Sequence, residues 1–245
     1  MSYMVISAGE AVVVDANRHV EEYIRVAQQE SARIVHVLDT HLHADHISGG
    51  LELAQKVGAK YWIAPEETEG AKFKYEPLQE GHLVLFGTSK LQVVGIRTPG
   101  HTVGSTSFFI DDNYLLTGET LFVSGLGRSD LKGRAKEMAE MMFDTVINKI
   151  AKLPDDMVIL PGHYADVQEM NEFGYVGAKM EDIRKNNSIL HVKDKQTFVD
   201  TAVTNVGVTP PNHDTIIAVN RRQIEVLPHE QTEMESGPNR CAMHS

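Results

Sequence analysis

Four apolar runs of this chain each end in a segment that carries side chains able to bind a metal ion, and this repetition constrains the fold most. The richest segment follows Ile34–Leu38 and places His41, His43, Asp45 and His46 within six residues. Imidazole nitrogen and carboxylate oxygen suit zinc, iron or manganese. In an extended segment, side chains two residues apart share a face. His41 and His43 can therefore reach one metal, while Asp45 and His46 turn toward a second position.

Three later segments carry one such side chain each. A Pro-Gly pair precedes both His101 and His163, and it predicts a turn that aims each imidazole away from the end of a strand. Glu119 stands between the apolar runs Leu115–Gly118 and Leu121–Phe122. Those neighbours predict a buried carboxylate, which needs a metal or another cation. We therefore expect one metal site assembled from four separated loops.

Composition narrows the possible partners. The chain has 245 residues, of which 42% are hydrophobic and 23% charged, as is ordinary for a soluble globular protein. A net charge of -11 argues against a nucleic acid as the main partner. Neither a membrane-spanning apolar run nor a signal-peptide pattern occurs. The single cysteine, Cys241, permits no disulfide within the chain, so we expect a cytoplasmic protein that does not bind membranes.

Hydrophobic periodicity predicts alternating strands and helices. The expected strands are 3–7, 11–15, 34–40, 60–64, 82–86, 91–98, 105–110, 114–118 and 158–160. The expected helices are 20–31, 48–57, 135–153, 170–185 and 194–205. This order favours an α+β fold with two sheets packed face to face and helices outside. We expect a single domain at 1–227, including a C-terminal helical segment, and a flexible tail at 228–245.

The four metal-type segments together resemble those of the metallo-β-lactamase superfamily, in order and approximate spacing, over about residues 1–180. The resemblance implies a four-layer αββα sandwich with a site at one edge of its sheets. It also implies a first metal position made by His41, His43 and His101 and a second made by Asp45, His46 and His163. A carboxylate bridges the two positions in the family. That carboxylate is usually Asp, whereas this chain has Glu119.

The segment Gly125–Asp130 looks like the Gly-x-Gly-Arg-x-Asp segment of persulfide dioxygenases. This second resemblance implies a single Fe(II) held by His41, His101 and Glu119, with open positions for substrate sulfur and oxygen. The other metal-type residues would then line the pocket or orient the ligands: His43, Asp45, His46 and His163. The implied substrates are O2 and a small persulfide such as glutathione persulfide, which would be oxidised to sulfite.

Two residues are candidates for a catalytic role, Asp45 and Arg128. Arg128 is our candidate for binding a substrate carboxylate, because a planar guanidinium suits bidentate contact. The alternative for Arg128 and Asp130 is an ion pair that only shapes the loop.

Two other functions remain open. A glyoxalase II-like thioester hydrolase would use all seven ligand-type residues and two zinc ions, or a mixed pair of zinc, iron and manganese. Alternatively, Glu119 marks a relative whose metal site is impaired and which acts without catalysis. The sequence also leaves open whether the chain forms a homo-oligomer.

Overall fold

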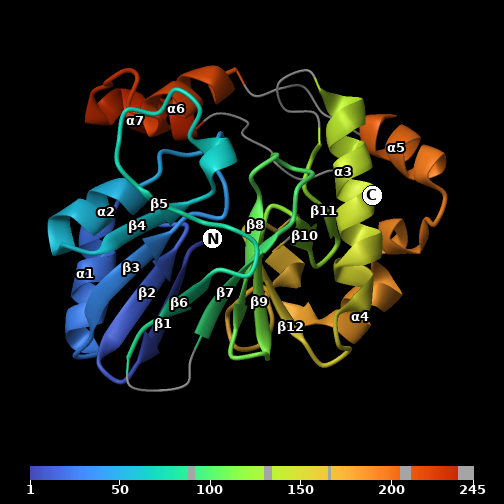
Figure 1. Cartoon of the computed structure of the whole chain (residues 1–245), viewed down its shortest axis with the longest axis horizontal. Coiled ribbons are helices and arrows are strands. Elements are labelled where there is room, and N and C mark those ends of the chain that lie inside the picture. The colour runs from blue at the N-terminus through green and yellow to red at the C-terminus, as the bar shows by residue number, and fades with distance from the viewer. Residues whose placement is uncertain (88–91, 130–133, 165–166, 205–210, 237–245) are drawn as a thin grey trace. The chain divides into compact units, whose positions relative to one another are not determined.

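The computed structural model describes residues 1–87, 92–129, 134–164, 167–204 and 211–236. The chain forms two compact units (Figure 1). The first comprises Met1–Val93 together with Thr209–Arg240, and the second comprises Val94–Val208. No helix among the described residues has the length and apolar character needed to cross a membrane.

The first unit is built on a mixed sheet with the order β1-β2-β3-β4-β5. Its strands are β1 (Tyr3–Ser7), β2 (Glu10–Val14), β3 (Arg33–Leu38), β4 (Lys60–Ile63) and β5 (Glu76–Pro77). The first two form an antiparallel hairpin, and the other neighbours pair in parallel. Helices α1 (Val20–Gln29) and α2 (Gly50–Val57) make the crossovers and pack on this sheet (Figure 1). Their apolar faces bury Val13, Val37 and Leu53 in one core.

The remaining elements of the first unit are short. They are the 3-10 turn η1 (Pro65–Glu67), strand β6 (Leu83–Leu85) and helices α6 (His213–Asn220) and α7 (Pro228–Glu235). The segment 228–235, expected to belong to a flexible tail, is therefore helical. Residues 237–245, which include Cys241, lie outside the described part of the chain.

The second unit contains a mixed sheet with strand order β13-β12-β9-β8-β7. Its strands are β7 (Gln92–Arg97), β8 (Thr106–Ile110), β9 (Tyr114–Gly118), β12 (Val158–Pro161) and β13 (Ala178–Lys179). Strands β10 (Leu121–Phe122) and β11 (Gly125–Leu126) form a separate hairpin. Its helices are α3 (Ala135–Asn148), α4 (Met180–Asn186) and α5 (Lys195–Thr204), and its 3-10 turns are η3 (Ile150–Lys152), η4 (Val167–Glu169) and η5 (Ser188–His191). Helices α3 and α5 meet through Phe143 and Phe198, whose ring centroids lie 5.4 Å apart.

The α+β class with two mixed sheets is confirmed, and one predicted helix is wrong. Residues 170–185 form a helix only from Met180. Before it, Asn171 Oδ1 accepts hydrogen bonds from the amides of Phe173 and Tyr175, and Gly174 has a φ of 81°. These features make a turn, since an asparagine side chain that binds nearby amides competes with helical bonding. The expected limits of a single domain at 1–227 stay a prediction.

Candidate metal centre

The histidine-rich segment lies in the loop that joins β3 to α2. Asp15 follows β2, the parallel neighbour of β3, and therefore stands beside the start of this loop. Its carboxylate accepts hydrogen bonds from Thr40 N at 2.7 Å and Thr40 Oγ1 at 2.9 Å. The backbone just before the first histidine is thus fixed by a buried acid on the next strand.

The loop gathers the four residues that the sequence places in it. The ring centroids of His41 and His43 lie 4.3 Å apart, and those of His43 and His46 also lie 4.3 Å apart. His41 is 2% exposed and His43 is 4% exposed. Ligand atoms of His43, Asp45 and His46 all lie within 4.8 Å of one another. This spacing is compatible with binding to a common cation.

The ring of His43 is oriented by Asp15. Its Nε2 lies 3.2 Å from Asp15 Oδ1, whereas its buried Nδ1 has no hydrogen-bond partner among the described residues. Burial by itself would lower the pKa of His43, but neighbouring carboxylates, first that of Asp15, outweigh it and raise this pKa to about 9. A histidine that donates one ring N–H to a carboxylate can present its other nitrogen to a metal. The unsatisfied Nδ1 therefore fits a metal ligand.

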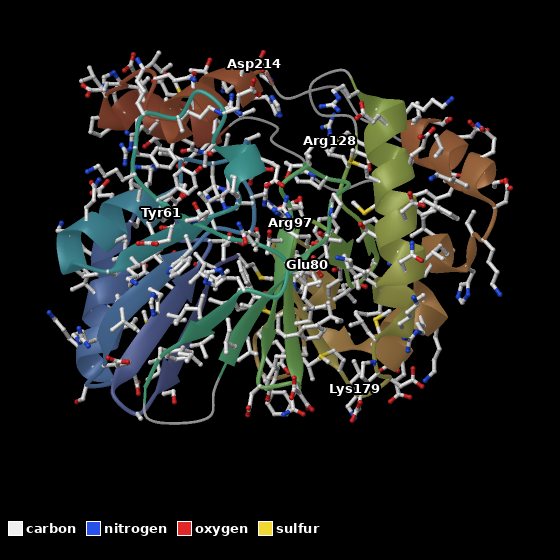
Figure 2. The ribbon with its side chains drawn as sticks, viewed as in Figure 1. Tyr61, Glu80, Arg97, Arg128, Lys179 and Asp214 are labelled. Carbon is white, nitrogen blue, oxygen red and sulfur yellow. The ribbon has the colours of Figure 1, made fainter. Side chains whose placement is uncertain are left out.

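Further buried acids support the loop, and the sequence analysis missed them. Asp39 Oδ2 accepts hydrogen bonds from Tyr61 Oη at 2.7 Å and Ser48 Oγ at 2.8 Å; Tyr61 is on β4 (Figure 2). Glu67 Oε2 accepts the amide of Leu42 at 3.0 Å. Asp15 and Asp39 each directly follow a buried strand. This is the same signal that singled out Glu119, so these two acids were recognisable from the sequence.

In the second unit, a tight turn between β7 and β8 presents His101. The amide of Gly100 donates to Thr102 O at 3.0 Å, and Gly100 has a φ of 148°. A Cβ at Gly100 would lie 2.6 Å from Met142 Cα, so only glycine fits there. His101 is 1% exposed, and its Nδ1 lies 2.9 Å from the carbonyl oxygen of Arg128. Such a bond fixes the ring and suits Nε2 to ligation.

Sheet register brings Glu119 and His163 together. Strands β9 and β12 pair in parallel, with Pro161 opposite Gly118, and Gly162 N donates to Gly118 O at 2.8 Å. The residues that follow each strand therefore lie side by side. Nδ1 of His163 is hydrogen-bonded to Glu119 Oε1. The prediction that Glu119 is buried is confirmed, since it is 3% exposed.

The segment after β11 packs against the Glu119 turn. A Cβ at Gly127 would lie only 1.7 Å from Glu119 O. Arg128, labelled in Figure 2, follows it and is 3% exposed. Its carbonyl oxygen is hydrogen-bonded to His101 Nδ1. Asp130, the partner of Arg128 in the alternative ion-pair reading, lies outside the described residues. A substrate-binding role for Arg128 stays a prediction.

Each unit thus assembles its own share of the predicted ligands. The first unit gathers His41, His43, Asp45 and His46 in one loop. The second places Glu119 against His163 and fixes His101 through the segment before Asp130. Binding of residues from both units to one ion stays a prediction.

Comparison with known proteins identifies the family of this chain and several of its relatives. A family model described as the metallo-beta-lactamase superfamily matches residues 1–163. The protein named "Probable polyketide biosynthesis zinc-dependent hydrolase BaeB" of Bacillus velezensis is 27% identical over 79% of this chain and 82% of its own length. Persulfide dioxygenase ETHE1 of Bos taurus is 30% identical over 63% of this chain and 59% of its own length. Hydroxyacylglutathione hydrolase of Rhizobium johnstonii is 30% identical over 57% of this chain and 52% of its own length.

The matched region therefore spans little more than half of the last two relatives. A crystal structure of a metallo-beta-lactamase from Staphylococcus aureus superposes with a TM-score of 0.81 and 27% identity, covering 92% of this chain and 70% of that chain. The superposition supports the fold, and the names of the sequence relatives divide between oxidation and hydrolysis.

Proposed function

Because this chain belongs to the metallo-beta-lactamase superfamily, we propose that its ligand-type residues bind the metal of an active site. Three observations support the fit. Buried His43 has an Nδ1 that no described residue satisfies, Asp45 and His46 place ligand atoms beside it, and Glu119 is a buried carboxylate. Imidazole and carboxylate are the donors that zinc and iron accept.

Within this family, we propose iron-dependent oxidation of a small persulfide such as glutathione persulfide. The observation that carries this proposal is the hydrogen bond between His101 Nδ1 and the carbonyl of Arg128. It shows that the segment resembling persulfide dioxygenases holds one proposed iron ligand, and Gly127 packs against a second, Glu119. The similarity to the persulfide dioxygenase of Bos taurus agrees with this choice.

The proposed iron ligands are His41, His101 and Glu119. Bound Fe(II) would supply the oxygen chemistry that the reaction needs. Thr40 Oγ1, 2.9 Å from Nδ1 of His41, orients the first imidazole. Arg128 O orients the second, and His163 contacts the carboxylate.

Asp45 and Arg128 remain the proposed catalytic residues. Asp45 Oδ1 lies 3.1 Å from Nδ1 of His46, and the residue is 8% exposed. Its charge would help to hold a proton or a polar substrate group beside the ligand loop. The Arg128 guanidinium would bind a carboxylate of the thiol carrier.

A dinuclear thioester hydrolase is the second candidate. The observation that favours it is that ligand atoms of His43, from the first metal position, and of Asp45 and His46, from the second, lie within 4.8 Å of one another, as two neighbouring metals would require. Two of the relatives described above also carry hydrolase names. A third reading, in which Glu119 leaves the site metal-poor, predicts that the chain binds neither Fe(II) nor Zn2+.

Metal counting combined with two assays separates these functions. The metal-free chain would be loaded anaerobically with Fe(II) or with Zn2+, and the bound metal measured by elemental analysis. We expect about one iron per chain and oxygen uptake with glutathione persulfide. Two metals per chain with cleavage of a glutathione thioester would replace the first proposal by the second. A chain that binds neither metal would contradict both.

A matched pair of variants completes the experiment. His101→Ala removes a proposed ligand from the second unit, whereas His191→Ala removes an exposed histidine of the same unit. We expect loss of metal and activity only from the first variant. Equal behaviour of the two variants would contradict the placement of the site.

A further inference from the structure

The C-terminal helices contact the ligand loop, although they lie outside residues 1–163 that match the family model. Asn220, at the end of α6, makes three hydrogen bonds to the backbone of this loop. Its Oδ1 accepts the amide of Ser48 at 2.9 Å. Its Nδ2 donates to His43 O and His46 O, each at 2.9 Å. One side chain thus bonds to the carbonyls of two ligand-type residues of the loop.

A second side chain, from α7, holds the adjoining residue. Glu235 Oε1 accepts the amide of Ile47 at 2.9 Å. Its Oε2 accepts Arg18 Nε at 2.7 Å, and Arg18 Nη2 donates to Thr232 Oγ1 at 2.9 Å. The carboxylate is therefore fixed by a cation from the N-terminal part of the unit while it binds the loop.

Apolar contacts bring α6 to the same place. Ile47 packs with Ile216 and Val219, which are 0% and 4% exposed. Ile216, Val219 and Asn220 follow at spacings of three and four, so they share one face of the helix. This face carries two apolar contacts and one polar side chain toward the loop.

The loop depends on such side chains because residues 39–47 contain no helix or strand. Backbone amides and carbonyls outside helices and sheets must form hydrogen bonds with side chains or water. The torsions of residues 43 to 46 also set the direction of the imidazoles. Metal–ligand distances tolerate deviations of only about 0.2 Å. Small backbone shifts in this loop would therefore weaken metal binding.

We propose that Asn220 and Glu235 are positioning residues that hold the ligand loop in its metal-binding conformation. The C-terminal helices are then part of the metal site, through backbone bonds and without supplying a ligand. This inference rests on the proposed function, because it assumes that the loop binds a metal.

The test compares two asparagines of this C-terminal segment. Asn220→Asp keeps an acceptor for Ser48 but replaces the amide donor with an oxygen that faces two carbonyls. Asn212→Asp makes the same chemical change where the side chain donates to Met234 O at 3.2 Å and does not bind the loop. The dissociation constant for Zn2+ would be measured for the full chain by competition with a chelator. We expect at least tenfold weaker binding for Asn220→Asp and a change below about twofold for Asn212→Asp.

Binding of Asn220→Asp within about twofold of the parent would overturn the inference. Equal weakening by Asn212→Asp would also overturn it, because the effect would then come from general helix packing. Thermal unfolding of the metal-free variants monitors folding, and a variant that fails to fold is replaced by Asn220→Ser, which is expected to bind Zn2+ more weakly for the same reason.

Hydrogen exchange gives a readout that needs no metal. In the metal-free chain, Asn220→Ala should speed exchange of the Ser48 amide at least tenfold, while Asn212→Ala should leave it unchanged. Unchanged exchange in Asn220→Ala would overturn the role of this side chain. A parent chain that binds no Zn2+ or Fe(II) would refute the proposed function. In that case, faster exchange of the Ser48 amide in Asn220→Ala would still show that Asn220 holds the loop.

Discussion

Gly127→Ala tests whether the segment before Arg128 sets the position of Glu119. In the structure, a Cβ at Gly127 would lie 1.7 Å from Glu119 O, whereas real Cβ atoms essentially never come within 3.0 Å of such an atom. The two backbones must therefore separate by about 1.3 Å, the difference between these two distances. The atom in the way is a backbone carbonyl, so no side-chain rotation relieves the overlap.

This displacement sets the size of the expected loss of stability and of the expected loss of metal affinity. Overpacking of this kind costs about 1–3 kcal/mol, which lowers the melting temperature of a chain this long by roughly 2–12 °C. A shift of about 1 Å also exceeds the tolerance of about 0.2 Å for a metal ligand. We therefore expect metal affinity to fall at least tenfold, as when the surroundings of a ligand are changed.

Ser124→Ala is the matched control, because Ser124 is exposed in the same β10/β11 hairpin. Chelator competition and thermal unfolding would be measured on the parent and both variants. The control should match the parent in both measurements. If Gly127→Ala bound metal within about twofold of the parent and unfolded within about 1 °C of it, the packing argument would be refuted.

Four further predictions concern the ligands, their support and the stability of the fold. Glu119→Asp withdraws the carboxylate by roughly 1.5 Å from His163, so we expect at least tenfold weaker metal binding by elemental analysis and chelator competition; tighter binding would show that the glutamate impairs the site. The pKa of His43 is raised to about 9 by carboxylates, so its Nδ1 must lose a proton to bind a metal, and affinity should rise with pH up to about 9 and then level off. By the same shift, the charge on His43 stabilises the metal-free fold fully below pH 6.5 and ceases to do so as the pH rises through about 9; urea unfolding across this range would detect the loss. Asp15→Asn removes the carboxylate that orients His43, and calorimetric titration should show metal affinity reduced about 10- to 100-fold, whereas unchanged affinity would contradict the orienting role.

The local elements of the site were predictable because their signals are local. An apolar run predicted β3, and the ligand-rich segment directly after it forms the loop between β3 and α2. The Pro-Gly pair before His101 produced a tight turn, with Gly100 at a φ of 148°. The apolar neighbours of Glu119 predicted its burial, which the structure confirms at 3% exposure.

Elements whose structure depends on hydrogen bonds from side chains to the backbone were less predictable. Residues 170–185 have helical periodicity, but Asn171 and Gly174 make a turn there. Residues 228–235 have a polar composition that suggested a tail, yet Glu235 binds Arg18 and the Ile47 amide, and the segment is helical. In both cases the deciding contacts are hydrogen bonds that a hydropathy pattern does not record.

The sequence by itself determined the kinds of donor atoms, the turns that carry them and the α+β order of elements. Only the tertiary structure decided which atom each donor faces. Asp15 meets His43 because β2 and β3 pair in parallel, Glu119 meets His163 because β9 and β12 do, and Asn220 reaches the ligand loop from α6. Periodicity reports which face of an element is apolar, whereas pairing between distant segments depends on sheet register and packing, which no local pattern encodes.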